Sequence, residues 1–528
     1  MKRRKFLGAT SSSIVSHWTL SHLACGQAKE LSDRALNSLE SAENELSGPP
    51  AGPWRRLFLD STVVEQQRGL SRVFHAAEKH PMNPVIVADR PWEGRSAIIG
   101  PYVYGTVVRE SSKFRMWYQI LFQGNHVGYA ESRDGIVWHK PDLTIIRHAD
   151  WQSTNLVVSA FAPEVSGGGH CHNPSVIRRP NESDPNRRYA LYGFDGKVGH
   201  PRVAFSADGL NWRYPSEGEQ QPLFKSSDVV NFFYDPYQDR YFSTWKTRNR
   251  RGRAVGIASS RDGTHWHKPI DAPVFVADDH DPDATQVYGM PVFPYQGLYI
   301  GLPWIYRARY FRFGDYSVDK LHEAQADSPR TMETQLAWSW DLVNWTRPQS
   351  RAQFIPLGGK DQWDRGMIVT ARAPVMVDDK LYFYYGGTDK VHDEKQVRAS
   401  IGLATLRLDG FCSMSTAGTE EGWLITRREP FREPAVIINA RTKPGGSITA
   451  DILDRKNRVV HGFSREACQA FSGDDTRHQL RWQSPAFDSI QDDYKIRFWL
   501  RDAELFSYLP QSLDPNQPDL ARFQTTGP

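Results

Sequence analysis

Ser132-Arg133-Asp134-Gly135-Ile136-Val137-Trp138 is the first of four similar hairpin sequences in the middle of the chain. An Asp-Gly pair favours a tight turn between antiparallel strands, because glycine accepts a positive φ and aspartate binds nearby backbone N–H groups. A proline follows each tryptophan by three residues and is expected to end the returning strand. The other three copies are 206–212, 260–266 and 339–345. We therefore interpret the serine and aspartate of each copy as residues that stabilise a turn.

Each hairpin sequence follows two strand-like segments, and this repeat predicts a β-propeller. Two strands and one hairpin make a four-stranded antiparallel blade, the repeating unit of that fold. The fourth hairpin has Leu342 in place of the glycine. A fifth unit is expected at 373–377, 380–386 and 400–408, with residues 55–60 completing that blade and closing the ring. The sequence thus predicts an all-β chain with a five-bladed β-propeller at residues 54–425.

Residues 426–510 differ in pattern and predict a small β-sandwich. Four segments alternate apolar and polar residues as half-buried strands do, namely 447–454, 459–463, 478–483 and 494–500. The proline-rich residues 511–528 are expected to be a tail. Residues 27–53 are expected to be an extended linker between the N-terminal segment and the propeller.

The N-terminal residues 1–26 predict export from the cytoplasm. Arg3-Arg4 followed by a weakly apolar stretch is typical of a twin-arginine signal. Cys25 is a candidate for lipidation, but His22 stands where a lipobox normally has leucine, which argues against a lipoprotein. We therefore expect a periplasmic or extracellular protein.

The charge balance argues against nucleic acid or an anionic membrane as a partner. The formal net charge of +4 equals the contribution of four N-terminal residues, Lys2, Arg3, Arg4 and Lys5. Without them, 61 basic residues face 61 acidic ones. A neutral chain has no basic patch of the kind that such partners require. No apolar run approaches the roughly 20 residues that a membrane helix needs.

The hairpin repeats and the expected domain order resemble the propellers of glycoside hydrolase families 32 and 43. The likeness covers roughly residues 54–425 and is closest to family 32-like bacterial proteins, as in Pro91-Trp92-Glu93. It implies a glycoside hydrolase-like protein that acts on a polysaccharide or oligosaccharide. Sialidase turns have one more residue between aspartate and glycine and match less well. Two alternatives stay open: a non-catalytic carbohydrate-binding propeller, and an adhesion or scaffold protein that uses the sandwich.

Carboxylates at the entrances of the innermost strands are the catalytic candidates, because glycoside cleavage commonly needs one carboxylic acid and one carboxylate. They are Asp228, Asp283, Glu93 and Asp364. The first strand of blade one lacks the aspartate that the resemblance implies, and Asn173 stands where the family tends to have another. An amide is neither an acid nor a base, so these departures favour the binding alternative.

Side chains that stack on a sugar ring or bind its hydroxyls are expected beside these carboxylates. The substrate-binding candidates are Asn173, His172, Trp363, Tyr288 and Trp304. Propeller geometry brings the entrances of all inner strands to one channel mouth. We therefore predict that at least three of the side chains of Asn173, Asp228, Asp283, Asp364 and Glu93 lie within about 12 Å of one another.

No metal and no cofactor are expected. The run 278–283 contains four aspartates, whose repulsion a cation, an arginine or a shared proton must relieve, but it lacks the EF-hand pattern. The segment 167–172 contains two histidines and Cys171, without a second cluster at zinc spacing. The sequence has no glycine-rich nucleotide loop.

Overall fold

The computed structural model describes residues 54–510 apart from internal gaps at 95–97, 122–123, 149, 161, 163–169, 216–221, 309–328, 393, 417–419, 431–434 and 484–492. The expected signal at 1–26, the linker at 27–53 and the tail at 511–528 lie outside the described residues. The glycines at 167–169, which precede His170, lie outside them as well.

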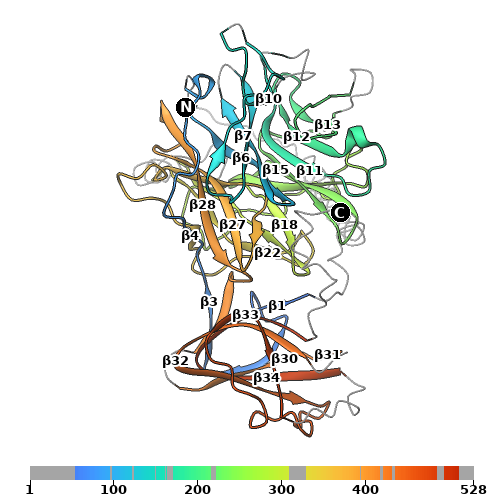
Figure 1. Ribbon diagram of the computed structural model, residues 1–528, viewed down its shortest axis with the longest axis vertical. Helices are drawn as coiled ribbons and strands as arrows, with labels where there is room; N and C mark the ends of the chain where they lie inside the picture. The colour runs from blue at the N-terminus through green and yellow to red at the C-terminus, as the bar shows by residue number, and fades with distance from the viewer. Residues whose placement is uncertain are drawn as a thin grey trace, which may run out of the picture.

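Regular structure in the described residues consists of strands and two short 3-10 helices, η1 (Pro91–Glu93) and η2 (Pro185–Arg187). The prediction of an all-β chain is therefore confirmed. Figure 1 shows an upper part built from several sheets and a lower part built around one large sheet. No helix in the described ranges is long and apolar enough to span a membrane.

Three antiparallel sheets form the first half of the upper part, each made of strands consecutive in the chain. The first contains β6 (Tyr102–Glu110), β7 (Lys113–Leu121), β8 (Asn125–Ser132), β9 (Trp138–His139) and β10 (Leu156–Val158). The second contains β11 (His172–Arg178), β12 (Tyr189–Asp195) and β13 (His200–Ser206). The third contains β14 (Val230–Asp235), β15 (Arg240–Asn249) and β16 (Gly252–Ser260).

A ten-stranded sheet and a four-stranded sheet complete the upper part, and we describe their strands as a fourth and a fifth group. The fourth contains β17 (Thr285–Gly289), β18 (Val292–Tyr295), β19 (Leu298–Gly301), β20 (Trp304–Arg307), β21 (Met332–Gln335), β22 (Ala337–Ser339), β23 (Trp345–Thr346) and β24 (Gln353–Ile355). The fifth contains β25 (Met367–Thr370), β26 (Val375–Val377), β27 (Lys380–Thr388), β28 (Val397–Arg407), β4 (Glu78–Lys79) and β5 (Ile98–Ile99). A single parallel pair, Met332 with Met367, links the two groups.

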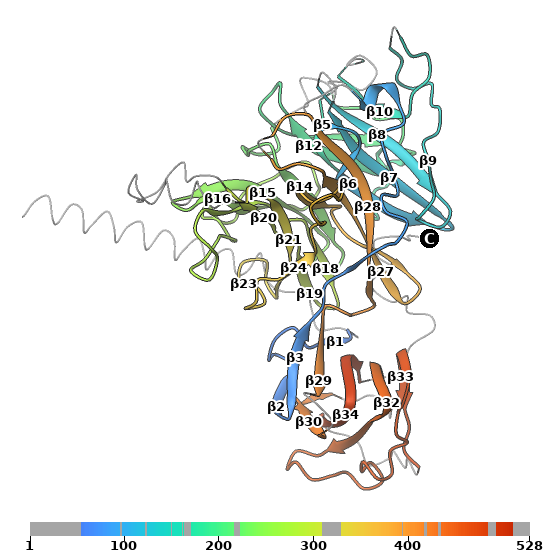
Figure 2. The same ribbon diagram turned by 90° about the vertical axis from the view of Figure 1, so that its left-hand side faces the viewer.

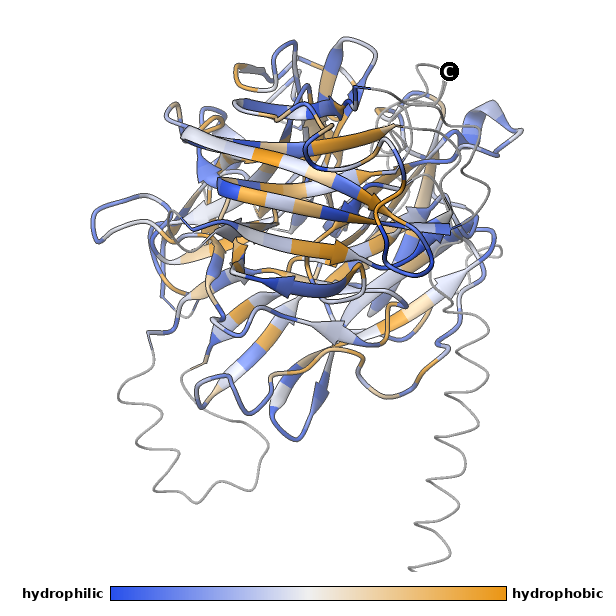
Figure 3. Cartoon of the chain, turned by 90° about the horizontal axis from the view of Figure 1, so that it is seen from below, coloured by the Kyte–Doolittle hydropathy of each residue, from blue (hydrophilic) through white to orange (hydrophobic). Residues whose placement is uncertain are grey.

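The lower part is a sheet of nine strands. They are β1 (Arg56–Leu57), β2 (Val64–Arg68), β3 (Leu70–Phe74), β29 (Cys412–Thr416), β30 (Gly422–Thr426), β31 (Glu429–Pro430), β32 (Val436–Leu453), β33 (Asp474–Leu480) and β34 (Asp493–Leu509). Seen from below, the strands of this sheet carry both apolar and polar residues (Figure 3).

Residues 55–60 do not complete the last blade, contrary to the sequence-based expectation. Strand β1 pairs with β34, and Phe58 is fully buried in the core of the lower part. Strands β4 and β5 instead pair with β28 in the fifth group. The lower sheet therefore takes strands from 56–74 and 412–430 in addition to those from residue 436 onward. Short-range patterns could not distinguish these destinations, because both offer an apolar face to the same segment.

The hairpin turns have the structure that the repeat predicts. The Asp134 carboxylate accepts the backbone N–H groups of Ile136 and Val137 at 2.8 and 2.9 Å, and Ser132 Oγ accepts that of Gly135 at 2.9 Å. Partial burial raises the pKa of Asp134, but these N–H groups outweigh it and lower the pKa below its ordinary value. The aspartate and serine of each turn are thus structural, as predicted.

Three of the hairpin turns also contact a strand group other than their own. The carbonyl of Gly209 accepts a hydrogen bond from Trp117 Nε1 in the first sheet at 2.7 Å, and that of Gly263 accepts one from Tyr192 in the second at 3.0 Å. The carbonyl of Gly135 accepts one from Tyr384 on β27 at 2.7 Å. The first sheet is thereby joined to the fifth group.

Candidate functional site

Five buried rings from three strands gather in one apolar core of the upper part. We call Tyr102, Tyr104, Tyr288, Trp304 and Tyr306 the central aromatic cluster. They come from the paired strands β17 and β20 and from β6, which is distant from both in the chain. Tyr104 and Trp304 stack with ring centroids 5.1 Å apart, and Tyr102 meets Tyr104 edge-on at 4.9 Å. The cluster is part of a packed apolar core where the first sheet meets the sheet that contains β17 and β20.

Asp228 and Lys246 form an ion pair beside this cluster. The Lys246 ammonium lies 2.5 Å from an Asp228 carboxylate oxygen and 4.3 Å from the centre of the Tyr288 ring. The lysine side chain is 9% exposed, whereas that of Asp228 is 48% exposed and available to a ligand. Burial raises the pKa of Asp228, but Lys246 outweighs it, and the pKa falls to about 2. Asp228 is therefore a charged carboxylate at neutral pH.

Two histidines and an arginine complete the polar surroundings of the cluster. His172 Nδ1 donates to the carbonyl oxygen of Asp228 at 2.8 Å, and its ring meets Tyr104 edge-on at 5.3 Å. Burial lowers the pKa of His172, so its imidazole is neutral at neutral pH. His392 Nε2 lies 3.0 Å from the Tyr288 hydroxyl, and the Arg253 guanidinium lies 5.4 Å from the same ring centre.

Asn173 joins three sheets and faces the protein interior. It is 1% exposed and has a φ of +61°, a conformation that asparagine tolerates better than most residues. Its Oδ1 accepts the backbone N–H of Val230 at 2.8 Å, and its Nδ2 donates to the carbonyl of Tyr104 at 3.3 Å. Its own N–H donates to Gln119 Oε1 at 2.8 Å. These bonds connect β6, β11 and β14 and occupy the amide that we expected to bind sugar.

Glu93 is a buried member of a structural ion pair. Its carboxylate lies 2.8 Å from Lys140 Nζ and accepts hydrogen bonds from the Tyr118 hydroxyl at 2.9 Å and the backbone N–H groups of Asp89 and Arg90 at 3.1 and 3.2 Å. The residue is 1% exposed. A carboxylate with this many partners is already satisfied and anchors the loop that contains η1.

Asp364 and Trp363 lie together in the fifth strand group. The Asp364 carboxylate lies 2.6 Å from Lys79 Nζ and accepts a hydrogen bond from the Tyr385 hydroxyl at 2.9 Å. Trp363 stacks on the same tyrosine with centroids 5.7 Å apart. Both residues contact the core between the fourth and fifth groups, whereas the central aromatic cluster belongs to a different core.

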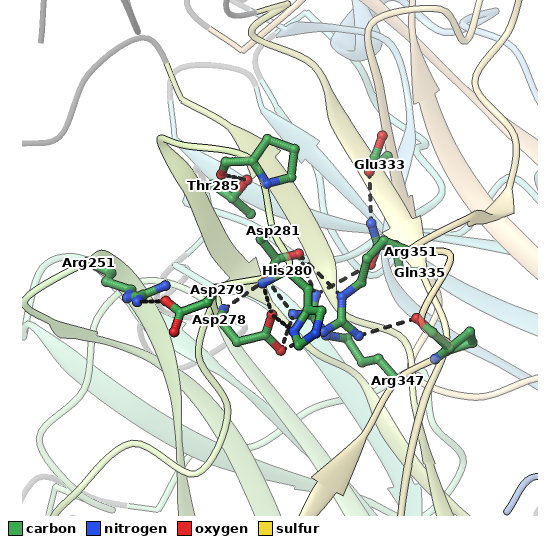
Figure 4. A network of polar contacts seen from close by, with 12 residues as sticks. Arg251, Asp278, Asp279, His280, Asp281, Thr285, Glu333, Gln335, Arg347 and Arg351 are labelled. Atoms are coloured by element: carbon green, nitrogen blue, oxygen red, sulfur yellow. Dashed lines mark hydrogen bonds and ion pairs between the residues drawn. The ribbon is translucent and has the colours of Figure 1, made fainter. Parts of the chain in front are cut away.

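Arginines relieve the repulsion in the acidic run that precedes β17. Arg347 Nη2 lies 3.1 Å from Asp278 and also pairs with Asp281, and Arg351 Nη2 lies 2.6 Å from Asp278 (Figure 4). Asp279 pairs with Arg251. In the part of the chain that the structure describes, no group of three or more His, Cys, Asp or Glu side chains is arranged to hold a metal ion. Asp283 is exposed and joins none of these contacts in the described residues.

The structure thus brings together only part of the predicted site. His172, Asp228, Tyr288 and Trp304 are linked through Tyr104 and Lys246, and Asn173 lies at their edge. The contacts of Glu93, Asp364 and Trp363 lead elsewhere, and the convergence of three acidic or amide side chains within about 12 Å stays a prediction.

Sequence reasoning missed Lys246, Arg253, His392 and Tyr306. A lysine next to Trp245 on a largely buried strand was the signal that could have identified Lys246, because such a charge requires a partner. The other three carry no comparable local signal.

No protein-family model matches the sequence, and no curated protein is significantly similar to it. Among solved structures, the chain is similar to a member of the GH130 family of mannoside phosphorylases. That structure is described as showing that the family contains glycoside hydrolases that target β-1,2 mannosidic linkages in Candida mannan. It is 16% identical, over 63% of this chain and 94% of that one, with a TM-score of 0.43. A glycosyl hydrolase from Bacteroides ovatus is 15% identical, over 63% and 94%, with a TM-score of 0.42. An N-acetylgalactosamine deacetylase from F. plautii in complex with blood group B trisaccharide is 14% identical, over 65% and 97%, with a TM-score of 0.41. Likenesses at this level do not transfer an activity, which has to be judged from the site itself.

Proposed function

We propose that the upper part is a five-bladed β-propeller and that it acts on carbohydrate at the central aromatic cluster. Five apolar cores support the ring, since each lies between strand groups that are neighbours in the proposed order. The core between the fifth group and the first contains Tyr384 and Phe114. The hydrogen bond from Tyr384 to Gly135 closes the same junction. Membership of family 32 or 43 stays a prediction.

The observation that carries the proposed function is the half-exposed, charged carboxylate of Asp228 beside buried aromatic rings. A carboxylate accepts hydrogen bonds from the hydroxyls of a sugar, and Asp228 is held beside the rings by Lys246, whose ammonium lies over Tyr288. Lys246 keeps Asp228 ionised and adds donors of its own. The arrangement suits a neutral, polyhydroxylated ligand better than an anion, which Asp228 would repel.

The chemistry of Asp228 supports one half of a hydrolytic mechanism. A carboxylate with a pKa of about 2 serves as a base or nucleophile at neutral pH and not as the proton donor to the leaving oxygen. The other predicted carboxylates Glu93 and Asp364 are bound by Lys140 and Lys79 away from the central aromatic cluster. This observation favours, as a second candidate function, carbohydrate binding without cleavage.

A panel of plant and algal polysaccharides tests both candidates when binding and release of reducing ends are measured on the same samples. If the protein is a glycosidase, Asp228→Asn lowers turnover at least about a hundredfold and leaves binding largely intact. If it only binds, the wild type retains glycans without releasing reducing ends, and Lys246→Met weakens retention. Asp142→Asn, at an exposed carboxylate away from the cluster, is the control. The absence of binding and of cleavage across the panel would refute the proposal.

We also propose that the protein is exported through its twin-arginine-type N-terminus. The support is the Arg3-Arg4 pair with the weakly apolar stretch that follows it. An exported protein meets polysaccharides that do not enter the cytoplasm, which is consistent with the proposed activity.

A further inference from the structure

A second candidate site lies where the upper and lower parts meet. It is a cavity of about 400 Å³. Its lining includes Glu78 and Arg407 from the upper part and Arg441, Asp474 and Phe506 from the lower part, with His75 between them. Figure 2 shows β3 and β29 leading from the lower part toward the upper part. We call this space the junction cavity.

Four charged side chains of the lining already have ion-pair partners, namely Arg407, Asp474, Asp379 and Arg441. Arg407 pairs with Asp474, Asp379 pairs with Arg477, and Arg441 Nε lies 3.0 Å from a Glu504 oxygen. An incoming ion would compete with these pairs, whereas a neutral ligand leaves them intact. At these four side chains a neutral ligand is therefore favoured over an ion.

The donors and acceptors of the junction cavity are held in fixed positions. The Phe506 ring is 2% exposed, and the guanidinium carbons of Arg407 and Arg441 lie 4.9 and 5.8 Å from its centre. Arg407 Nε also donates to Asn439 Oδ1 at 2.7 Å. Paired guanidiniums and carboxylates keep spare N–H groups and lone pairs, which suit sugar hydroxyls because a hydroxyl both donates and accepts.

We infer that the junction cavity binds one or two neutral sugar units, at a site separate from the central aromatic cluster. This inference rests on the proposed function for its ligand class. A volume of about 400 Å³ lies within the usual range of roughly 300–1,000 Å³ for small-molecule sites. A second site in the same chain would hold a polysaccharide at two points and raise its retention.

Saturation-transfer NMR of the exported form with D-glucose, D-galactose, D-mannose and L-arabinose, each added separately, tests the inference. Ala76 is exposed and lines the cavity, so Ala76→Trp fills it without removing a charged partner. Ser71→Trp, at an exposed position of β3 outside the lining, is the matched control. Arg441→Gln removes a hydrogen-bond donor of the lining at a half-exposed side chain. Because it adds no bulk, it shows whether the effect of Ala76→Trp is specific to the cavity.

The expected result is that at least one sugar binds at two sites in the wild type and in Ser71→Trp. Ala76→Trp should abolish one of the two, and Arg441→Gln should weaken the same one about tenfold. The inference is overturned if none of the four sugars shows binding that is sensitive to Ala76→Trp. Binding that Lys246→Met abolishes but Ala76→Trp does not leaves only the proposed function standing. Binding that Ala76→Trp abolishes but Lys246→Met does not would support the junction cavity and contradict the proposed function.

Discussion

Asn173 illustrates how one buried side chain restricts the choice of residue. Its amide accepts the Val230 N–H and donates to the Tyr104 carbonyl, which an ionised carboxylate cannot do. An aspartate would leave the Tyr104 carbonyl without this donor and would bury a charge. The asparagine that we interpreted as a lost catalytic aspartate therefore has a structural reason to be an amide.

Replacing Asn173 by aspartate is expected to destabilise the fold. Loss of the donor and burial of a carboxylate should lower the free energy of unfolding by about 1–3 kcal/mol. Chemical denaturation at neutral pH measures this change. Asn186→Asp, at an exposed position, is the control and should have almost no effect. Equal stability of the two variants would contradict the role of Asn173 in connecting β6, β11 and β14 through its hydrogen bonds.

The ion pair of Asp228 predicts a pH dependence of stability. The folded pKa of about 2 is lower than the ordinary value of 3.8, so the pair stabilises the fold fully above about pH 4. This contribution should decline as the pH falls from about 4 through about 2. Denaturation of wild type and Asp228→Asn at several pH values should show a stability difference that is largest above pH 4 and shrinks in acid. A difference that grows in acid would be incompatible with the pairing.

At the scale of elements, the hairpin turns are stabilised by contacts within a few residues of each aspartate. Asp208 and Asp262 accept the N–H groups two and three residues ahead at 2.8–2.9 Å, as Asp134 does. Alanine at any of these three positions should lower stability by about 0.5–2 kcal/mol. Asp134→Asn keeps an acceptor oxygen and should retain most of the stability. Thermal denaturation of the series gives the comparison, and an alanine variant as stable as wild type would contradict it.

The fourth hairpin deviates from the repeat for a reason that packing explains. Leu342 has a φ of +69°, which is unfavourable for leucine, but its side chain is fully buried beside Phe242. Relief of about 1–2 kcal/mol of backbone strain competes with about 2–5 kcal/mol of lost burial. Leu342→Gly should therefore destabilise the protein even though it restores the repeat.

A comparison with alanine separates the two effects at Leu342. Leu342→Ala loses the same burial but keeps the strained φ, so it should be less stable than Leu342→Gly by about 1 kcal/mol. Urea denaturation of both variants provides the test. If alanine were the more stable of the two, backbone strain would not govern this turn.

At the scale of the whole molecule, the N-terminal strands tie the two parts together. Strands β1–β3 precede the upper sheets in the sequence but belong to the lower sheet. In addition, Arg55 Nε lies 2.6 Å from a carboxylate oxygen of Asp409. The lower sheet therefore cannot be completed until both ends of the chain have been made. This order is compatible with an export route that carries folded proteins.

The export proposal is tested by replacing Arg3 and Arg4 with lysine. A twin-arginine signal requires the arginine pair, so the double variant should accumulate as precursor in the cytoplasm. Cell fractionation with immunoblotting measures the distribution. Lys5→Arg, next to the pair, should leave export unchanged. Normal export of the double variant would exclude a twin-arginine route.

Features that depend on neighbouring residues were determined by the sequence alone. The Asp-Gly turns, the alternating strands and the all-β class follow from local hydrogen bonds and from the two-residue period of strands. The structural role of Asp134 was predictable for the same reason, because its partners lie within three residues.

Only the tertiary structure decided which charged side chains meet. Glu93, Asp364 and Asp228 were all predicted from the sequence as carboxylates at strand entrances. In the structure, Lys140 and Lys79 bind Glu93 and Asp364 in the interior. Asp228, which pairs with Lys246, stays half-exposed. The destination of residues 55–60 was decided in the same way, by pairing with a strand from the other end of the chain. The free energy of an ion pair or a strand pair depends on the partner's position in space, which short-range sequence patterns do not encode.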